Sequence, residues 1–167
     1  MTDHILVERS GAVQVIRLNR PEKKNAITRA MYDAMAEALR AGDADNDVRV
    51  HVFLGTPGSF SSGNDLQDFL AVATGGDHGQ DVFDFLVALA TAKKPVVSGV
   101  DGLAIGIGTT IHLHCDLTLA TPGSVFRTPF TDLGLVPEAA SSLIAPQMMG
   151  HQRAFALLGM GEGFSAE

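Results

Sequence analysis

Two kinds of apolar segment alternate along this chain, and this alternation limits its possible folds more than any other feature. Short runs rich in β-branched residues are typical of strands, whereas longer segments with apolar residues about four positions apart are typical of helices. The expected strands are 5–8, 13–18, 48–54, 95–100 and 117–120, the first two joined as a hairpin by Ser10-Gly11-Ala12. Because strands that alternate with helices pair in parallel, the order of segments predicts an α/β layer fold.

The first helix has the clearest boundaries. Apolar residues recur every four positions from 27 to 39, Thr28 is a candidate N-cap, and Gly42 is a candidate stop. Further helices are expected near 65 and over 82–92, 106–114, 137–149 and 153–160. The third of these, 106–114, is apolar nearly all round, which predicts a buried helix. Since 167 residues fit one domain and can bury ~70% of the unfolded surface, one core is expected.

Composition and charge exclude several classes of protein. Hydrophobic residues make up 46% of the chain and charged residues 19%, which excludes intrinsic disorder. The net charge of −7 disfavours a nucleic-acid partner. No apolar run reaches the roughly 18 residues that span a bilayer, so no membrane association is expected. Cys115 is the one cysteine, and the first ten residues lack an export signal, so the expected compartment is the cytoplasm.

Basic residues gather near the N-terminus. Residues 1–40 contain seven basic and five acidic side chains, a net charge of +2, so the remainder of the chain carries −9. The densest part is the turn Arg20-Pro21-Glu22-Lys23-Lys24. Such a turn serves either as an anion-binding site or simply as a solvated turn, and charge alone does not decide between the two.

Two glycine-rich turns each follow an expected strand and lead into an expected helix. One is Ser-Ser-Gly-Asn-Asp at 61–65, and the other spans 102–108 and contains Gly102, Gly106 and Gly108. Backbone N–H groups at such turns can bind an anion or stabilise a developing oxyanion. Glycines also occur where two elements merely pack closely, so each turn by itself supports both interpretations.

The chain has no convincing cofactor or metal motif. The Gly106-x-Gly108 pair lacks the third glycine of a dinucleotide fingerprint, and neither a phosphate-binding P-loop nor a nucleophile elbow is present. In the run His-Leu-His-Cys-Asp at 112–116, residues two apart on a helix point about 200° apart and cannot share one ion. We therefore expect neither a separate cofactor nor a metal.

Glu138 is a lone carboxylate in an apolar stretch, at the expected first turn of a helix. The dipole of that helix would favour the ionised form by ~0.3–1 kcal/mol. Desolvation can raise a carboxyl pKa by up to ~3–5, so burial of Glu138 would dominate. A buried Glu138 would be a candidate general base near neutral pH, although an ordinary glutamate at a helix start gives the same pattern.

Taken together, these elements resemble the crotonase family, the enoyl-CoA hydratase/isomerase superfamily. The matching stretches are LNRPEKKNAI (18–27), FSSGNDL (60–66), KKPVVSGVDGLAIGIGTTIHLHCDLTLAT (93–121) and the segment 126–167, which begins FRTPF. The resemblance covers nearly the whole chain and implies a spiral core of repeated β-β-α units. It also implies an acyl-CoA thioester as substrate, with coenzyme A as part of that substrate.

The resemblance assigns roles to individual positions. The backbone N–H groups of Asn64 and Ile107 would form an oxyanion hole for the thioester oxygen, and Glu138 would transfer the proton. The residues implied to contact substrate or coenzyme A are Lys24, Ala26, Ser62, Asp65, Leu66, Phe130, Gly134 and Leu135.

The family's hydratases carry two glutamates, at positions occupied here by Thr110 and Phe130. Neither side chain exchanges a proton with water at neutral pH. Glu138, within Pro-Glu-Ala-Ala-Ser-Ser, matches instead the single glutamate of the Δ3,Δ2-enoyl-CoA isomerase branch. The resemblance thus implies isomerisation of a 3-enoyl-CoA to a 2-enoyl-CoA. The alternatives are hydration, another enolate-forming reaction, and a non-catalytic binding or scaffold protein.

Members of the family normally continue past the position of Glu167 into helices that cover the acyl site and build trimers. Residues 1–167 are therefore expected to form the crotonase-like core domain without that helical segment. A homotrimer or hexamer is expected where the segment is present.

Overall fold

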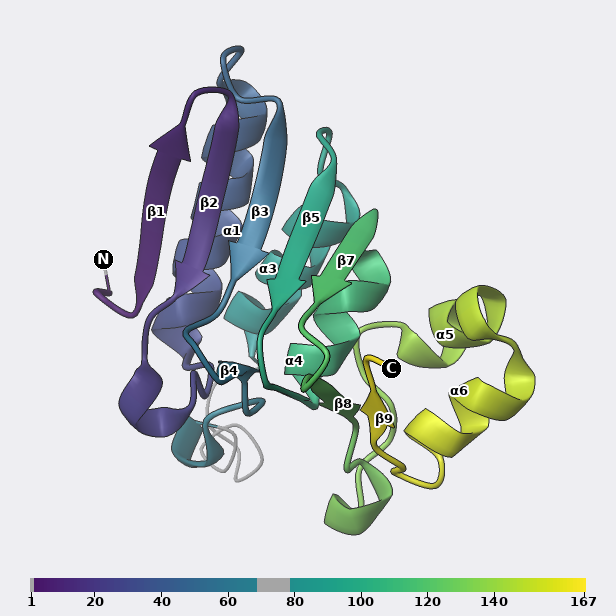
Figure 1. The fold of residues 1–167 in the computed structure, drawn as a ribbon. Helices are drawn as coiled ribbons and strands as arrows, with labels where there is room; N and C mark the ends of the chain where they lie inside the picture. Colours follow the sequence, from purple (N-terminus) through teal and green to yellow (C-terminus); the bar gives the residue numbers. More distant parts are fainter. Residues whose placement is uncertain (1, 69–78) are drawn as a thin grey trace.

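Figure 1 shows the computed structural model, which describes residues 2–68 and 79–167. One sheet of this part of the chain consists of β1 (Ile5–Ser10), β2 (Val13–Leu18), β3 (Val50–Leu54), β5 (Val96–Val100) and β7 (Leu117–Ala120), side by side in that order. A second sheet consists of β4 (Ser59–Ser61), β6 (Leu103–Ile105), β8 (Val125–Arg127) and β9 (Phe164–Ser165). The β1–β2 and β8–β9 pairs are antiparallel, and the other pairs are parallel.

The chain repeats one path between the two sheets. It leaves the first sheet by β3, β5 or β7 and enters the second by β4, β6 or β8, and helical residues follow each time. Each repeat therefore adds one strand to each sheet, parallel to the preceding one. This is the α/β spiral of β-β-α units that the family resemblance implies, so the fold prediction is confirmed.

Helices cover one face of the first sheet. Behind it in Figure 1 lie α1 (Arg29–Ala44) and α3 (Gln80–Ala90). Alternate residues of the strands point into this core, and Phe53 of β3 packs edge to face on Phe85 of α3, with ring centroids 6.3 Å apart. The ring of Phe85 also packs against the ring of Tyr32 of α1, with ring centroids 5.5 Å apart. Aromatic packing thus joins both helices to the sheet.

The later helices are shorter. After β6 come α4 (Ile107–Thr110) and the 3-10 turn η2 (Ile111–His114), and after β8 come η3 (Thr131–Leu133), α5 (Ser141–Met149) and α6 (His151–Leu158). The last two lie beside the core near the C-terminus (Figure 1). They pack on Phe130 in a separate small cluster with Ala145, Ala154, Leu157 and Leu158. No helix within 2–68 or 79–167 has the length and apolarity to cross a membrane.

The sequence predicted that the first helix ends at Gly42, and this prediction is wrong. The helix α1 continues to Ala44, and Gly42 is buried inside it. A Cβ atom at Gly42 would overlap the amide of Gln14 and lie 2.6 Å from the ring of His51. Gly42 is therefore a close-approach residue that lets α1 lie against the sheet. Thr28 is the N-cap residue as predicted, but its side chain makes no capping hydrogen bond. Instead, the Arg29 N–H donates to Oδ2 of Asp68 at 2.9 Å.

Other boundaries also differ from the prediction. The strands β4, β6, β8 and β9 were not predicted, because they are two or three residues long and too short to show a period of two. The predicted helix at 106–114 is α4 followed by the 3-10 turn η2, and the helix predicted from Pro137 begins only at Ser141. Near Asp65, residues 66–68 are helical, and 69–78 lie outside the described residues.

Candidate active site

A cavity of about 820 Å³ lies where the two glycine-rich turns meet the segment that carries Glu138. Segments 20–26, 62–67, 105–107 and 129–138 contribute to its wall. The predicted site residues that line it are Ala26, Ser62, Asn64, Asp65, Leu66, Ile107, Phe130, Leu135 and Glu138. The fold thus brings nine of the eleven predicted site residues to one cavity.

Lys24 and Gly134 are the two predicted residues outside this lining. The backbone carbonyl of Lys24 accepts hydrogen bonds from the Ser62 N–H, at 2.9 Å, and from the Ser59 hydroxyl, at 3.0 Å, while its side chain is exposed. Gly134 has a left-handed φ of 66° and caps η3, just before Leu135. Lys23, which the site prediction omitted, lines the cavity with an exposed side chain.

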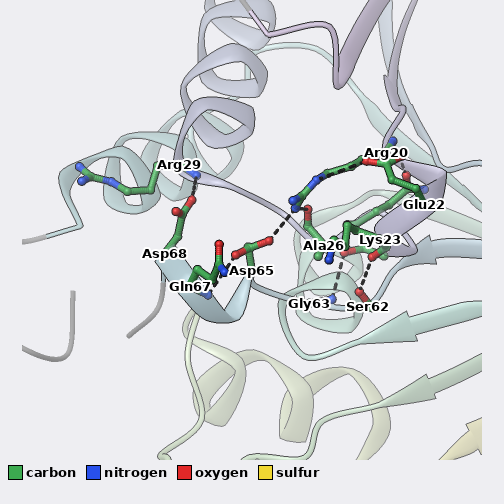
Figure 2. A network of polar contacts seen from close by, with 12 residues as sticks. Arg20, Glu22, Lys23, Ala26, Arg29, Ser62, Gly63, Asp65, Gln67 and Asp68 are labelled. Carbon is green, nitrogen blue, oxygen red and sulfur yellow. Dashed lines mark hydrogen bonds and ion pairs between the residues drawn. The ribbon is translucent and has the colours of Figure 1, made fainter. Parts of the chain in front are cut away.

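Arg20 forms an ion pair with Asp65, as Figure 2 shows. Its Nη1 lies 2.7 Å from Oδ2 of Asp65 and also donates to the backbone carbonyl of Ala26, and about 15% of each paired side chain is exposed. The Arg20 guanidinium holds the pKa of Asp65 below its ordinary value. The basic turn therefore offers a ligand the charges of Lys23 and Lys24, whereas Arg20 ties two walls of the cavity together.

The backbone N–H of Asn64 points away from its neighbouring segment. Ile27 forms a parallel bridge with Asn64, in which the Ile27 N–H donates to the Gly63 carbonyl at 2.8 Å and the Asp65 N–H donates to the Ile27 carbonyl at 2.9 Å. In parallel pairing, the residue between these two bonds directs its own N–H to the opposite side. Within residues 2–68 and 79–167 this N–H has no acceptor, and Asn64 lines the cavity.

The second unpaired N–H group belongs to Ile107. Gly106 precedes it with φ 58° and ψ −123°, a conformation that an L side chain rarely adopts, and its carbonyl accepts the N–H groups of Thr109 and Thr110. The Ile107 N–H has no acceptor among the residues that the structure describes. A Cβ atom at Gly106 would lie 3.9 Å from Cα of Gly63, so the two turns are adjacent. Both unpaired donors therefore belong to one region of the cavity wall.

Glu138 lines the same cavity, and its carboxyl is held by a hydroxyl. Oε1 of Glu138 accepts a hydrogen bond of 2.7 Å from Oγ1 of Thr110, which is fully buried. Burial raises the pKa of Glu138 to about 7, against the smaller opposing effect of this hydrogen bond. Because α5 begins at Ser141, Glu138 does not lie in the first turn of a helix, and the expected helix-dipole effect has no structural basis. Burial dominates, as the prediction required.

Two further residues of the site region were missed from the sequence. The hydroxyl of Tyr32 donates a short hydrogen bond to Oδ1 of Asn64. Tyr32 is buried in α1, and this burial, together with the charge of Glu138, raises its pKa well above the usual value. In the sequence, Thr110 is notable only because hydratases of the family carry a glutamate at this position. Neither contact has a sequence pattern, because Tyr32 lies within an ordinary apolar helix face and Thr110 lies 28 residues from Glu138.

The histidine cluster of η2 is not arranged as a metal site. His112 is buried against Phe60, with ring centroids 4.6 Å apart, and its Nδ1 lies 2.9 Å from Oγ of Ser98. Burial lowers the pKa of His112 to about 4. Within the described ranges, no three His, Cys, Asp or Glu side chains come close enough together to hold a metal ion.

Comparison with known proteins adds an independent observation. A family model described as Enoyl-CoA hydratase/isomerase matches residues 8–167. A rat protein named Enoyl-CoA delta isomerase 2 is 37% identical over 97% of this chain and 42% of its own length. Enoyl-CoA hydratase ACTT3 of Alternaria alternata is 34% identical over 95% of this chain and 54% of its own length.

Solved structures agree with the sequence matches. The structure of OdaA from Pseudomonas aeruginosa is 46% identical, with a TM-score of 0.92 over 98% of this chain and 66% of that one. The chain spans between 42% and 64% of the length of three curated relatives that it matches.

Proposed function

Because this chain belongs to the enoyl-CoA hydratase/isomerase family, we propose that it binds an acyl-CoA thioester and converts a 3-enoyl-CoA to a 2-enoyl-CoA. The observation that carries the proposal is the position of Glu138. Its half-buried side chain, with a pKa that desolvation raises to about 7, lines the same cavity as the unpaired N–H groups of Asn64 and Ile107. A base and an oxyanion hole on one cavity are the two groups that enolate chemistry requires.

The reaction follows from this arrangement. The thioester oxygen accepts hydrogen bonds from the Asn64 and Ile107 N–H groups, which lowers the energy of the enolate. The Glu138 carboxylate removes a proton from C2 of the 3-enoyl-CoA, and the C2–H electrons form a dienolate. The same carboxyl then gives the proton to C4, and the double bond ends between C2 and C3. The shuttle conserves all atoms and needs no separate cofactor.

The occupants of the two hydratase positions favour isomerisation over hydration. Phe130 is buried in the cluster beneath α5 and α6, and Thr110 donates its hydroxyl proton to Glu138 itself. Neither supplies a second carboxyl to activate water. Hydration with one glutamate remains the second candidate, because the Alternaria relative is named as a hydratase. A scaffold protein would not need the buried carboxyl of Glu138.

The composition of the cavity wall also suits the proposed ligand. Lys23 in the lining and the adjacent exposed Lys24 supply positive charge for the phosphates of coenzyme A. Leu66, Leu133 and Leu135 make the lining apolar for an acyl chain. A cytoplasmic location and assembly into trimers or hexamers remain predictions from the sequence.

A substrate panel tests the reaction. We expect the protein to convert 3-enoyl-CoAs to 2-enoyl-CoAs faster than it hydrates 2-enoyl-CoAs, with products identified by mass spectrometry and NMR. The Glu138→Gln variant is expected to lose ~10²–10⁴ in kcat while retaining acyl-CoA binding, because the N–H donors are unchanged. Faster hydration than isomerisation, or a Gln variant with the wild-type rate, would show the assignment to be wrong.

A further inference from the structure

The segment that follows Thr109 makes two contacts with the chain around Glu138. Oγ1 of Thr110 donates to Oε1 of Glu138 at 2.7 Å, and Nε2 of His114 lies 2.8 Å from the backbone carbonyl of Ala139. Thr110 ends α4 and His114 ends η2, and both side chains reach the short segment formed by Glu138 and Ala139. One contact fixes the carboxyl, and the other fixes the main chain that carries it.

The main chain after Glu138 has an unfavourable conformation. Ala139 and Ala140 have φ values of 50° and 52°, in the left-handed region that alanine rarely adopts. Such a conformation persists only where neighbouring contacts hold it. The carbonyl of Glu138 accepts the Ser141 N–H at 2.9 Å, and His114 holds the carbonyl of Ala139. The carbonyl of Ala140 accepts the Leu143 and Ile144 N–H groups as well, so these contacts together hold the turn that follows Glu138.

We propose that Thr110 and His114 are positioning residues for Glu138, the first orienting its carboxyl and the second holding the left-handed turn that directs it into the cavity. This inference rests on the proposed role of Glu138 as the base. Thr110 donates a hydrogen bond to Oε1 of Glu138, which leaves Oε2 for the substrate. Position 110, which carries a glutamate in hydratases of the family, thus orients Glu138 here. His114 belongs to the His-Leu-His-Cys-Asp run that the sequence analysis rejected as a metal site, and its contact with Ala139 gives it a structural role.

The Thr110 hydroxyl also determines how readily Glu138 ionises. A donor to a carboxylate stabilises the ionised form and opposes the effect of burial. Other titratable groups surround this carboxyl: Tyr32 of α1, whose pKa is raised by burial and by Glu138 and Asp81, and His114. An Nε2–H group of His114 donates to the Ala139 carbonyl.

Paired substitutions of Thr110 separate positioning from simple packing. Thr110→Val keeps the shape but removes the donor, and it is expected to raise the pKa of Glu138 by about one, the effect of one hydrogen bond to a charged group. Thr110→Ser keeps the donor and is expected to restore the wild-type pKa. We would titrate the Glu138 carboxyl by 13C NMR in the ligand-free protein and record the pH profile of kcat. At pH 6 the Val variant should be about tenfold slower, with a smaller loss at pH 9.

His114 is tested by its effect on kcat relative to KM. His114→Ala is expected to lower kcat about tenfold with little change in KM, because the lysines that bind coenzyme A lie elsewhere. His114→Gln retains an N–H donor and should recover much of the loss. Matched controls are Thr118→Val, whose hydroxyl bonds to Ser98, and the exposed His151→Ala, and both should keep wild-type kinetics.

The results distinguish this inference from the proposed function. An unchanged Glu138 pKa and pH profile in Thr110→Val, or equal losses in the Val and Ser variants, would overturn the role of Thr110. A His114→Ala variant that changes only stability would overturn the role of His114. Full activity in Glu138→Gln would instead refute the base itself, and the NMR titration of Thr110→Val would still report whether the hydroxyl controls the carboxyl.

Discussion

Replacing Glu138 with Gln is expected to stabilise the folded protein, and to do so more strongly as the pH rises. Burial raises the pKa of Glu138 from 4.5 to about 7, so the folded protein holds this proton more tightly than the unfolded chain does. A raised pKa contributes stability that is fully present below pH 4.5 and is lost as the pH rises through 7. Glutamine cannot ionise and therefore does not lose this contribution.

The size of the effect follows from the two pKa values. The difference between 4.5 and about 7 corresponds to about 3 kcal/mol in the free energy of unfolding. At pH 5 the unfolded carboxyl is already largely ionised, so about 1 kcal/mol of the loss is present there, and the full amount is reached near pH 8.5. The amide oxygen of glutamine can still accept the Thr110 hydrogen bond. We therefore expect the variant to be more stable by about 1 kcal/mol at pH 5 and about 3 kcal/mol at pH 8.5.

Urea unfolding at the two pH values, followed by circular dichroism, measures this difference. Glu162→Gln is the matched control, because it removes one negative charge from an exposed position. The control is expected to change the free energy of unfolding by less than ~0.5 kcal/mol at both pH values. Equal stabilisation of Glu138→Gln at pH 5 and pH 8.5, or destabilisation at pH 8.5, would refute the argument that burial penalises the charged carboxylate.

Three further predictions concern the basic turn and the two glycine-rich turns. Lys24→Glu and Lys23→Glu are expected to weaken acyl-CoA binding in calorimetry at low salt, and unchanged affinity in both would remove the basic turn from the binding site. Asn64→Ala is expected to keep most activity because the proposed donor is a main-chain N–H, whereas a loss of ~10²–10³ in kcat would assign a role to the side chain. In Gly108→Ala, the new Cβ would lie 2.8 Å from the carbonyl oxygen of Ser61, so a loss of about 1–3 kcal/mol in stability is expected in urea unfolding, together with lower kcat. Wild-type values for Gly108→Ala would mean that the two turns need not approach so closely.

Elements with a local periodic signal can be predicted from the amino-acid sequence alone. The opening hairpin, α1, β3, β5 and β7 are long enough for their apolar residues to show a period of two or of nearly four. The two glycine-rich turns and Glu138 were likewise identifiable, because each is a distinct residue type at a boundary between elements. Family resemblance then placed Asn64, Ile107 and Glu138 in one site, which the fold brings to a single cavity.

The surroundings of these residues depend on contacts between distant parts of the chain. The three-residue strands β4, β6 and β8 exist because neighbouring repeats pair with them, and so few residues have no period of their own. Asp65 forms an ion pair with Arg20, which lies 45 residues away in the sequence. Thr110 donates a hydrogen bond to the carboxyl of Glu138, 28 residues away. The pKa of Glu138 depends on burial by such distant segments. Desolvation and side-chain hydrogen bonding act between residues that the fold brings together, so a local sequence pattern contains no record of them.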